Sequence, residues 1–216
     1  MQRRDFLRLA GATTVAAAIP GVCRAAESQP TKKIRPALYT GIDYSIPFAD
    51  LIPQIRQAGF EVVALGAKPE HSGYDTAEGR AAIRRLLDQH GMTLDSIHAP
   101  FPQGDRLFDL DDAKRQESVR QCKRAIDAAD ELEGRIVVLH LIQPYDIPHR
   151  EKRDRMIVLG KESLRVLIEH AQARRVQLAL ENGQRRDYDE VLENCLAEFG
   201  GPTVGFCYDS GHENVQ

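Results

Sequence analysis

The stretch VQLALENG, residues 176–183, shows the pattern on which the fold of this chain depends. A short apolar run ends abruptly in an acid and an amide. Successive side chains of a strand point to opposite faces, so Leu178 and Leu180 share one face while Ala179 and Glu181 share the other. The larger apolar side chains suit packing against outer helices. The small residue beside the acid suits a crowded barrel interior.

The same unit, a strand followed by a helix, recurs along the chain. Apolar and β-branched runs predict six strands, at 35–43, 60–66, 92–98, 135–141, 176–181 and 203–209. Helical spacing of apolar residues predicts helices over 48–58, 76–90, 112–132, 155–173 and 188–199. Such alternation is typical of a parallel sheet covered by helices. We therefore expect an α/β fold with one domain over residues 34–216.

Each of the last four predicted strands ends in a side chain that can bind a metal or transfer a proton. These residues are His98, His140, Glu181 and Asp209, and Asn182 and His212 follow closely. In parallel barrels and open α/β sheets the ligand site lies at the carboxyl ends of the strands, so these side chains should converge. Carboxylate and imidazole ligands together suit Mn, Zn, Co or Fe, whereas carboxylates alone suit Mg or Ca.

Each of these residues taken alone also has an ordinary structural explanation. A histidine at a strand end is often only hydrogen-bonded. Asp209, followed by Ser210 and Gly211, could cap a short helix. Their occurrence at four successive strands favours a functional metal site over these explanations.

Four segments resemble the sugar phosphate isomerase/epimerase superfamily, which is the xylose isomerase-like TIM barrel group and includes endonuclease IV-type AP endonucleases. They read IHAPF at 97–101, VLH at 138–140, ALEN at 179–182 and FCYDSGH at 206–212. The resemblance implies a (β/α)8 barrel, of which residues 34–216 hold about six βα units. In the family the seventh strand supplies a His ligand and the eighth a Glu ligand, so we expect a C-terminally truncated, partial barrel.

The resemblance also implies roles for individual residues. Glu181 would be a metal ligand and a catalytic acid/base, and Asp209 would be a second metal ligand. Residues expected to bind the substrate or shape its pocket are His212, His98, His140 and Asn182, the last by orienting the Glu181 carboxylate. The implied cofactor is a divalent metal, namely Mn, Zn, Co, Fe or Mg.

The implied activity is a metal-dependent isomerase or epimerase acting on a sugar, sugar phosphate or polyol through an enediolate, with carboxylate acid/base catalysis. Two alternatives remain open. One is a zinc-dependent AP endonuclease that uses the same three histidines and two acids as ligands. The other is an inactive or binding-only fragment of the barrel.

The first 26 residues have the layout of an export signal. The pair Arg3-Arg4, followed by Phe6-Leu7 and a mildly apolar run, resembles a twin-arginine signal, and residues 27–33 read as a linker. We therefore expect export to the periplasm by the twin-arginine translocase. Loss of four arginines and one aspartate with this signal would change the net charge from -3 to -6. Both features oppose a nucleic-acid partner and favour a small carbohydrate, with a homodimer possible.

Three cysteines, Cys122, Cys195 and Cys207, follow the predicted signal. An odd number does not suit a disulfide framework, and their neighbours are apolar. We expect buried free thiols.

Overall fold

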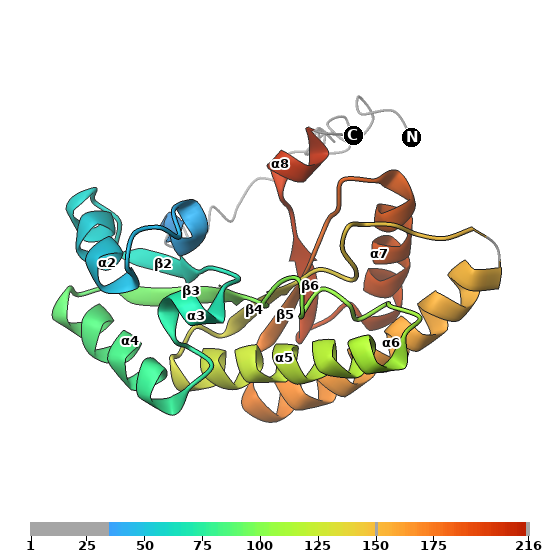
Figure 1. Ribbon diagram of the computed structural model, residues 1–216, viewed down its shortest axis with the longest axis horizontal. Helices are drawn as coiled ribbons and strands as arrows, with labels where there is room; N and C mark the ends of the chain where they lie inside the picture. The colour runs from blue at the N-terminus through green and yellow to red at the C-terminus, as the bar shows by residue number, and fades with distance from the viewer. Residues whose placement is uncertain (1–34, 150, 215–216) are drawn as a thin grey trace, which may run out of the picture. The chain divides into compact units, whose positions relative to one another are not determined.

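Six short parallel strands lie side by side in the order in which they occur along the chain (Figure 1). The computed structural model describes residues 35–149 and 151–214. The strands are β1 (Ala37–Tyr39), β2 (Val62–Leu65), β3 (Thr93–His98), β4 (Ile136–Leu139), β5 (Gln177–Glu181) and β6 (Val204–Cys207). All six strands expected from the sequence are therefore present, and every neighbouring pair is parallel. Their carboxyl ends consequently share one edge of the sheet.

Helices connect the strands, as parallel pairing requires. The long ones are α2 (Phe48–Gln57), α4 (Ala77–Gln89), α5 (Asp112–Glu131), α6 (Glu151–Arg174) and α7 (Arg186–Phe199). In space, α5 contacts β3 and β4, α6 packs on β5 and α5, and α7 packs on β5 and β6. This arrangement is the expected α/β architecture, and it corresponds to part of a (β/α)8 barrel.

The core lies between the sheet and these helices. The apolar stripe predicted for α5 is buried, with Cys122 and Ile126 fully enclosed. In β5, Leu178 and Leu180 are fully buried against the helices, as the alternation predicted. Residues such as these fix the sheet and thereby the positions of the strand ends.

Some element boundaries differ from those expected. The first strand ends at Tyr39, and a 3-10 turn, Thr40–Ile42, replaces its predicted end. Helix α6 begins four residues early at Glu151, where two acids in its first turn favour the helix N-terminus. Two four-residue helices, α3 (Pro69–Ser72) and α8 (Ser210–Glu213), were not predicted because they are too short to show a periodic pattern.

The outer face of β6 corrects another expectation. The alternation that places Leu178 and Leu180 against outer helices predicts the same for Phe206 and Tyr208, but these two side chains belong to residues that are 52% and 61% exposed. Their rings pack against each other, with centroids 6.2 Å apart, and the described helices leave this face open.

The cysteine expectation is partly confirmed. Cys122 and Cys195 are buried free thiols, whereas Cys207 is only half-buried. The expected export signal and linker fall within residues 1–34, outside the described part of the chain. Among the described residues, no helix combines the length and the apolar character needed to cross a bilayer.

Candidate functional site

A cavity of about 630 Å³ opens at the carboxyl ends of the strands. All four predicted strand-end residues line it, and His212 joins them from α8. These residues lie at or just beyond the ends of β3, β4, β5 and β6, or in α8, and the parallel sheet brings them together. The cavity volume falls within the range of about 300–1,000 Å³ that is common for small-molecule sites.

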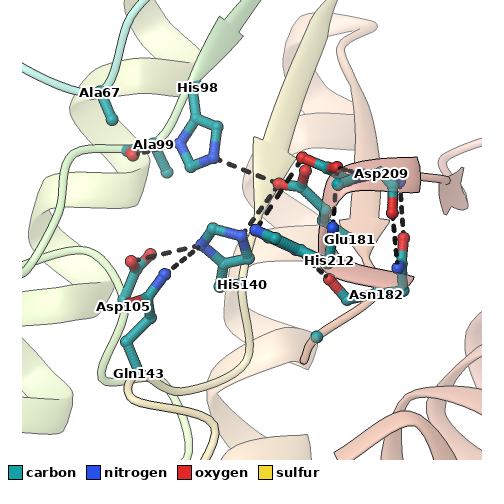
Figure 2. A network of polar contacts seen from close by, with 12 residues as sticks. Ala67, His98, Ala99, Asp105, His140, Gln143, Glu181, Asn182, Asp209 and His212 are labelled. Carbon is teal, nitrogen blue, oxygen red and sulfur yellow. Dashed lines mark hydrogen bonds and ion pairs between the residues drawn. The ribbon is translucent and has the colours of Figure 1, made fainter. Parts of the chain in front are cut away.

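Glu181, the last residue of β5, lies at the centre of this group (Figure 2). Its Oε2 atom is 3.2 Å from His98 Nε2 and 3.0 Å from His140 Nε2. The residue is only 6% exposed. Burial disfavours the charged carboxylate, but hydrogen bonds and charge from the two histidines outweigh it and hold the pKa of Glu181 well below its usual range.

Two histidines are oriented by backbone carbonyl groups. His98 Nδ1 lies 2.7 Å from the Ala99 carbonyl oxygen, and His212 Nδ1 lies 2.7 Å from that of Asn182. A carbonyl oxygen only accepts, so Nδ1 carries the hydrogen in both rings. The other ring nitrogen, Nε2, faces Glu181 in His98 and Tyr145 in His212.

A buried carboxylate that no sequence pattern singled out orients His140. Asp105, in the loop between β3 and α5, is fully buried, and its Oδ2 lies 3.3 Å from His140 Nδ1. Burial opposes protonation of His140, but hydrogen bonds to Asp105 and Glu181 outweigh it and raise its pKa to about 9. Asp105 lies seven residues beyond the end of β3, so it does not belong to the pattern of strand-end residues.

Tyr145 is a second site residue that sequence reasoning missed. It lies in the loop after β4, and its hydroxyl is 3.4 Å from His140 Nε2 and 3.3 Å from His212 Nε2. Gln143 Nε2 donates to the same hydroxyl at 2.9 Å. The backbone of Tyr145 has a φ of 63°, which a non-glycine residue adopts only when its surroundings compel it.

Asp209 takes the capping role that the sequence left open and keeps a carboxylate oxygen beside the site. It is the N-cap of α8, where its Oδ1 accepts a hydrogen bond from the His212 backbone nitrogen at 3.1 Å. Its other oxygen, Oδ2, lies 3.9 Å from His212 Nε2. Helix capping thus uses one carboxylate oxygen and leaves the other beside the site.

Asn182 differs from its expected role. It is buried and bonds to the backbone of Asp209, so it orients the end of β6 rather than the Glu181 carboxylate. The expectation that Asn182 contacts the substrate stays a prediction.

The chemistry of these residues fits a divalent cation. Two sets of potential ligands each have their atoms within 4.8 Å of one another, namely His98, His140 and Glu181, and Glu181, Asp209 and His212. A neutral imidazole with its hydrogen on Nδ1 presents a lone pair at Nε2, which repels the lone pairs of a carboxylate. A proton or a cation between them removes the repulsion. Mixed imidazole and carboxylate ligands suit Mn, Zn, Co or Fe.

Comparison with known proteins gives one match to a protein family. A family model described as xylose isomerase-like TIM barrel matches residues 52–216. The uncharacterized protein y4fM of Sinorhizobium fredii is 28% identical over 182 residues, which cover 73% of this chain and 58% of that protein. This chain therefore spans less than two thirds of the length of that relative.

Solved structures show the same fold. A D-tagatose 3-epimerase-like protein superposes with a TM-score of 0.69 at 19% identity, over 82% of this chain and 66% of the other. A D-psicose 3-epimerase determined in the presence of D-fructose gives a TM-score of 0.68 at 18% identity, over 85% of this chain and 66% of the other. At this identity the likeness extends to the fold alone.

Proposed function

Because the chain belongs to the xylose isomerase-like TIM barrel family, we propose that it is a metal-dependent isomerase or epimerase of a sugar, sugar phosphate or polyol. One observation carries this proposal: Glu181 is buried at the carboxyl ends of the strands, among imidazole and carboxylate groups from neighbouring segments. Structural neighbours named as 3-epimerases of D-tagatose type and of D-psicose point to ketohexoses as the first substrates to test.

The proposed cation ligands are the carboxylates of Glu181 and Asp209. These two residues end neighbouring strands and have oxygen atoms within 4.8 Å of each other. A divalent cation bound there would polarise a substrate carbonyl group and acidify the adjoining C–H bond.

The protein side chains then supply proton transfer and orientation. Glu181 takes the proton from the substrate carbon; its return to the neighbouring carbon gives isomerisation, whereas epimerisation needs a second acid on the opposite face of the substrate. The two histidine contacts favour the ionised carboxylate, which is the form that accepts a proton. Both histidine contacts involve Oε2, so the carboxylate has its second oxygen for this exchange. His212 and Tyr145 face the same space and are positioned to hold a substrate oxygen.

Exchange of substrate C–H with solvent deuterium tests this proposal directly. The purified protein is stripped with EDTA, reloaded separately with Mn²⁺, Co²⁺, Zn²⁺ or Mg²⁺, and incubated with ketohexoses and their phosphates in D₂O. We expect cation-dependent incorporation of deuterium at the carbon next to the carbonyl, which proton NMR detects as a loss of signal. We also expect a new sugar to appear on chromatography. Absence of exchange with every cation and sugar would reject the isomerase or epimerase.

A zinc-dependent AP endonuclease is a second candidate. It is favoured by the fact that the two potential ligand sets share Glu181, an arrangement compatible with more than one cation. Zinc stoichiometry and cleavage of an abasic DNA duplex discriminate between the candidates. Several bound zinc ions with strand cleavage and without sugar exchange would establish the endonuclease instead.

A further inference from the structure

We propose that Asp105 is a positioning residue that fixes which ring nitrogen of His140 faces the site. This inference rests on the proposed function and extends it to a residue outside the cavity lining. Asp105 has no contact with Glu181, and it acts only through the imidazole ring between them (Figure 2).

The burial of Asp105 is the first argument. Its carboxylate is fully enclosed, and its Oδ1 atom has no hydrogen-bond partner among the described residues. A buried carboxylate without compensating partners costs several kcal/mol, so the single contact of Oδ2 with His140 Nδ1 has to supply much of the compensation. An imidazole N–H is the donor that a carboxylate oxygen accepts from, so we place a hydrogen on Nδ1. Nε2 is thereby directed at Glu181.

Gln143 makes a contact with His140 that competes with the one from Asp105. Gln143 Nε2 lies 3.4 Å from the same His140 Nδ1, and a donor there would require a lone pair on Nδ1. The same amide donates to the Tyr145 hydroxyl at the shorter distance of 2.9 Å. Gln143 therefore has a better acceptor, whereas Asp105 Oδ2 accepts from no other side chain in the described part of the protein. The hydrogen of Nδ1 is assigned to the bond with Asp105.

The loop that carries Asp105 is fixed to the end of β4, where His140 begins the next loop. The Asp105 carbonyl oxygen accepts from the Gln143 backbone nitrogen at 3.0 Å, and Phe108 donates its backbone N–H to the Leu141 carbonyl at 3.1 Å. From α5, Ser118 Oγ bonds to the Gly104 carbonyl at 2.5 Å. The carboxylate and the imidazole are thus held on joined backbone segments, which keeps their relative position constant.

Fixing the ring matters because His140 belongs to the set of potential ligands formed with His98 and Glu181, and a cation that binds its Nε2 displaces any hydrogen on that atom. Second-layer partners of histidine ligands typically contribute about 10- to 100-fold to metal affinity. We expect Asp105→Asn, which keeps the shape but removes the charge, to weaken Zn²⁺ binding within that range. The matched control is Asp127→Asn, since Asp127 Oδ1 makes the same kind of bond to His170 Nε2, at 2.8 Å, on the outer helices α5 and α6.

The experiment combines Zn²⁺ titration by calorimetry with NMR of the whole chain labelled with ¹⁵N-histidine. In wild-type protein, with and without Zn²⁺, we expect a solvent-protected His140 Nδ1–H resonance, assigned with the His140→Gln variant. Asp105→Asn should lose that protection and bind Zn²⁺ more weakly. Asp127→Asn should change neither the His140 resonance nor the affinity for Zn²⁺.

The outcomes separate this inference from the proposed function. A wild-type His140 that lacks a protected Nδ1–H overturns the inference, and this measurement does not require any variant to fold. Wild-type affinity in Asp105→Asn, or an equal loss in Asp127→Asn, overturns it as well. If wild-type protein binds no Zn²⁺ but shows the protected Nδ1–H, the proposed cation site fails while the orientation of His140 by Asp105 stands.

Discussion

The side chain of Asn182 is hydrogen-bonded to both the backbone nitrogen and the backbone oxygen of Asp209. Its Oδ1 accepts from Asp209 N at 2.6 Å, and its Nδ2 donates to Asp209 O at 3.0 Å. The backbone pairing of β5 with β6 ends at Glu181 and Cys207. The Asn182 side chain then holds the backbone of Asp209, just beyond the end of β6. The two acids of the site are consequently held in a fixed relationship.

Replacement of Asn182 by Ala should lower both stability and cation affinity. The backbone N–H and C=O of Asp209 each lose a part-buried hydrogen bond, at a net cost of about 0.5–1.5 kcal/mol for each bond. Asp209 also loses its fixed position, so we expect Zn²⁺ affinity to fall about tenfold. Urea denaturation and calorimetric titration measure the two effects. Asn194→Ala, an exposed amide on α7, is the control and should be nearly neutral; equal effects in both variants would contradict the assigned role.

Replacement of Glu181 by Gln should abolish turnover and leave the fold intact. The amide matches the carboxylate in shape but cannot take a proton from carbon, and acid–base groups contribute about 100- to 10,000-fold to rates. Deuterium exchange measures the loss, and circular dichroism checks the fold. The control is Glu198→Gln on α7, whose carboxylate pairs with Lys161 and Arg165 at the surface. Exchange at the wild-type rate in Glu181→Gln would remove Glu181 from the mechanism.

Replacement of Tyr188 by Phe should destabilise the protein. The fully buried Tyr188 hydroxyl accepts from the Leu141 backbone nitrogen at 2.7 Å and donates to the Glu181 carbonyl oxygen at 3.2 Å. It therefore joins the ends of β4 and β5, and its loss leaves buried polar groups unpaired, at about 1–3 kcal/mol. The urea midpoint should fall accordingly. Tyr208→Phe, which removes an exposed hydroxyl, should leave the midpoint within error.

The buried thiol of Cys195 should resist alkylation in the folded protein. Burial raises its pKa from an ordinary value of 9.0 to about 11. Because the thiolate is the reactive form, a shift of two units lowers the rate of iodoacetamide labelling about a hundredfold at pH 8. The rate of labelling, measured by mass spectrometry, should continue to rise above pH 9 instead of reaching a plateau there. The chain in urea is the control and should react at the ordinary rate.

The raised pKa of Cys195 also predicts how the stability of the folded protein changes with pH. The unfolded chain loses the Cys195 proton near pH 9, whereas the folded chain keeps it to about pH 11. The folded state is therefore fully favoured by this thiol below pH 9 and loses that advantage as the pH rises toward 11. A Cys195→Ala variant should show a smaller loss of stability across this interval. An identical loss would assign the pH dependence to other groups.

The sequence by itself determined the six strands, the five long helices and the group of strand-end residues. Apolar alternation and helical spacing are local properties, and the burial of residues such as Leu178 and Ile126 follows from them directly. Once strands are parallel, their carboxyl ends share one edge. His98, His140, Glu181 and Asp209 therefore converge without further information.

Only the tertiary structure decided which partners orient those residues. Asp105 reaches His140 across 35 positions of sequence, and Tyr145 approaches His212 across 67. The partner of Asn182 and the exposure of Phe206 likewise depend on neighbouring elements. Such contacts are set by the paths of loops and by the packing of helices that are distant along the chain. Local patterning contains no information about them, because the energy of each contact depends on groups that the fold alone brings within reach.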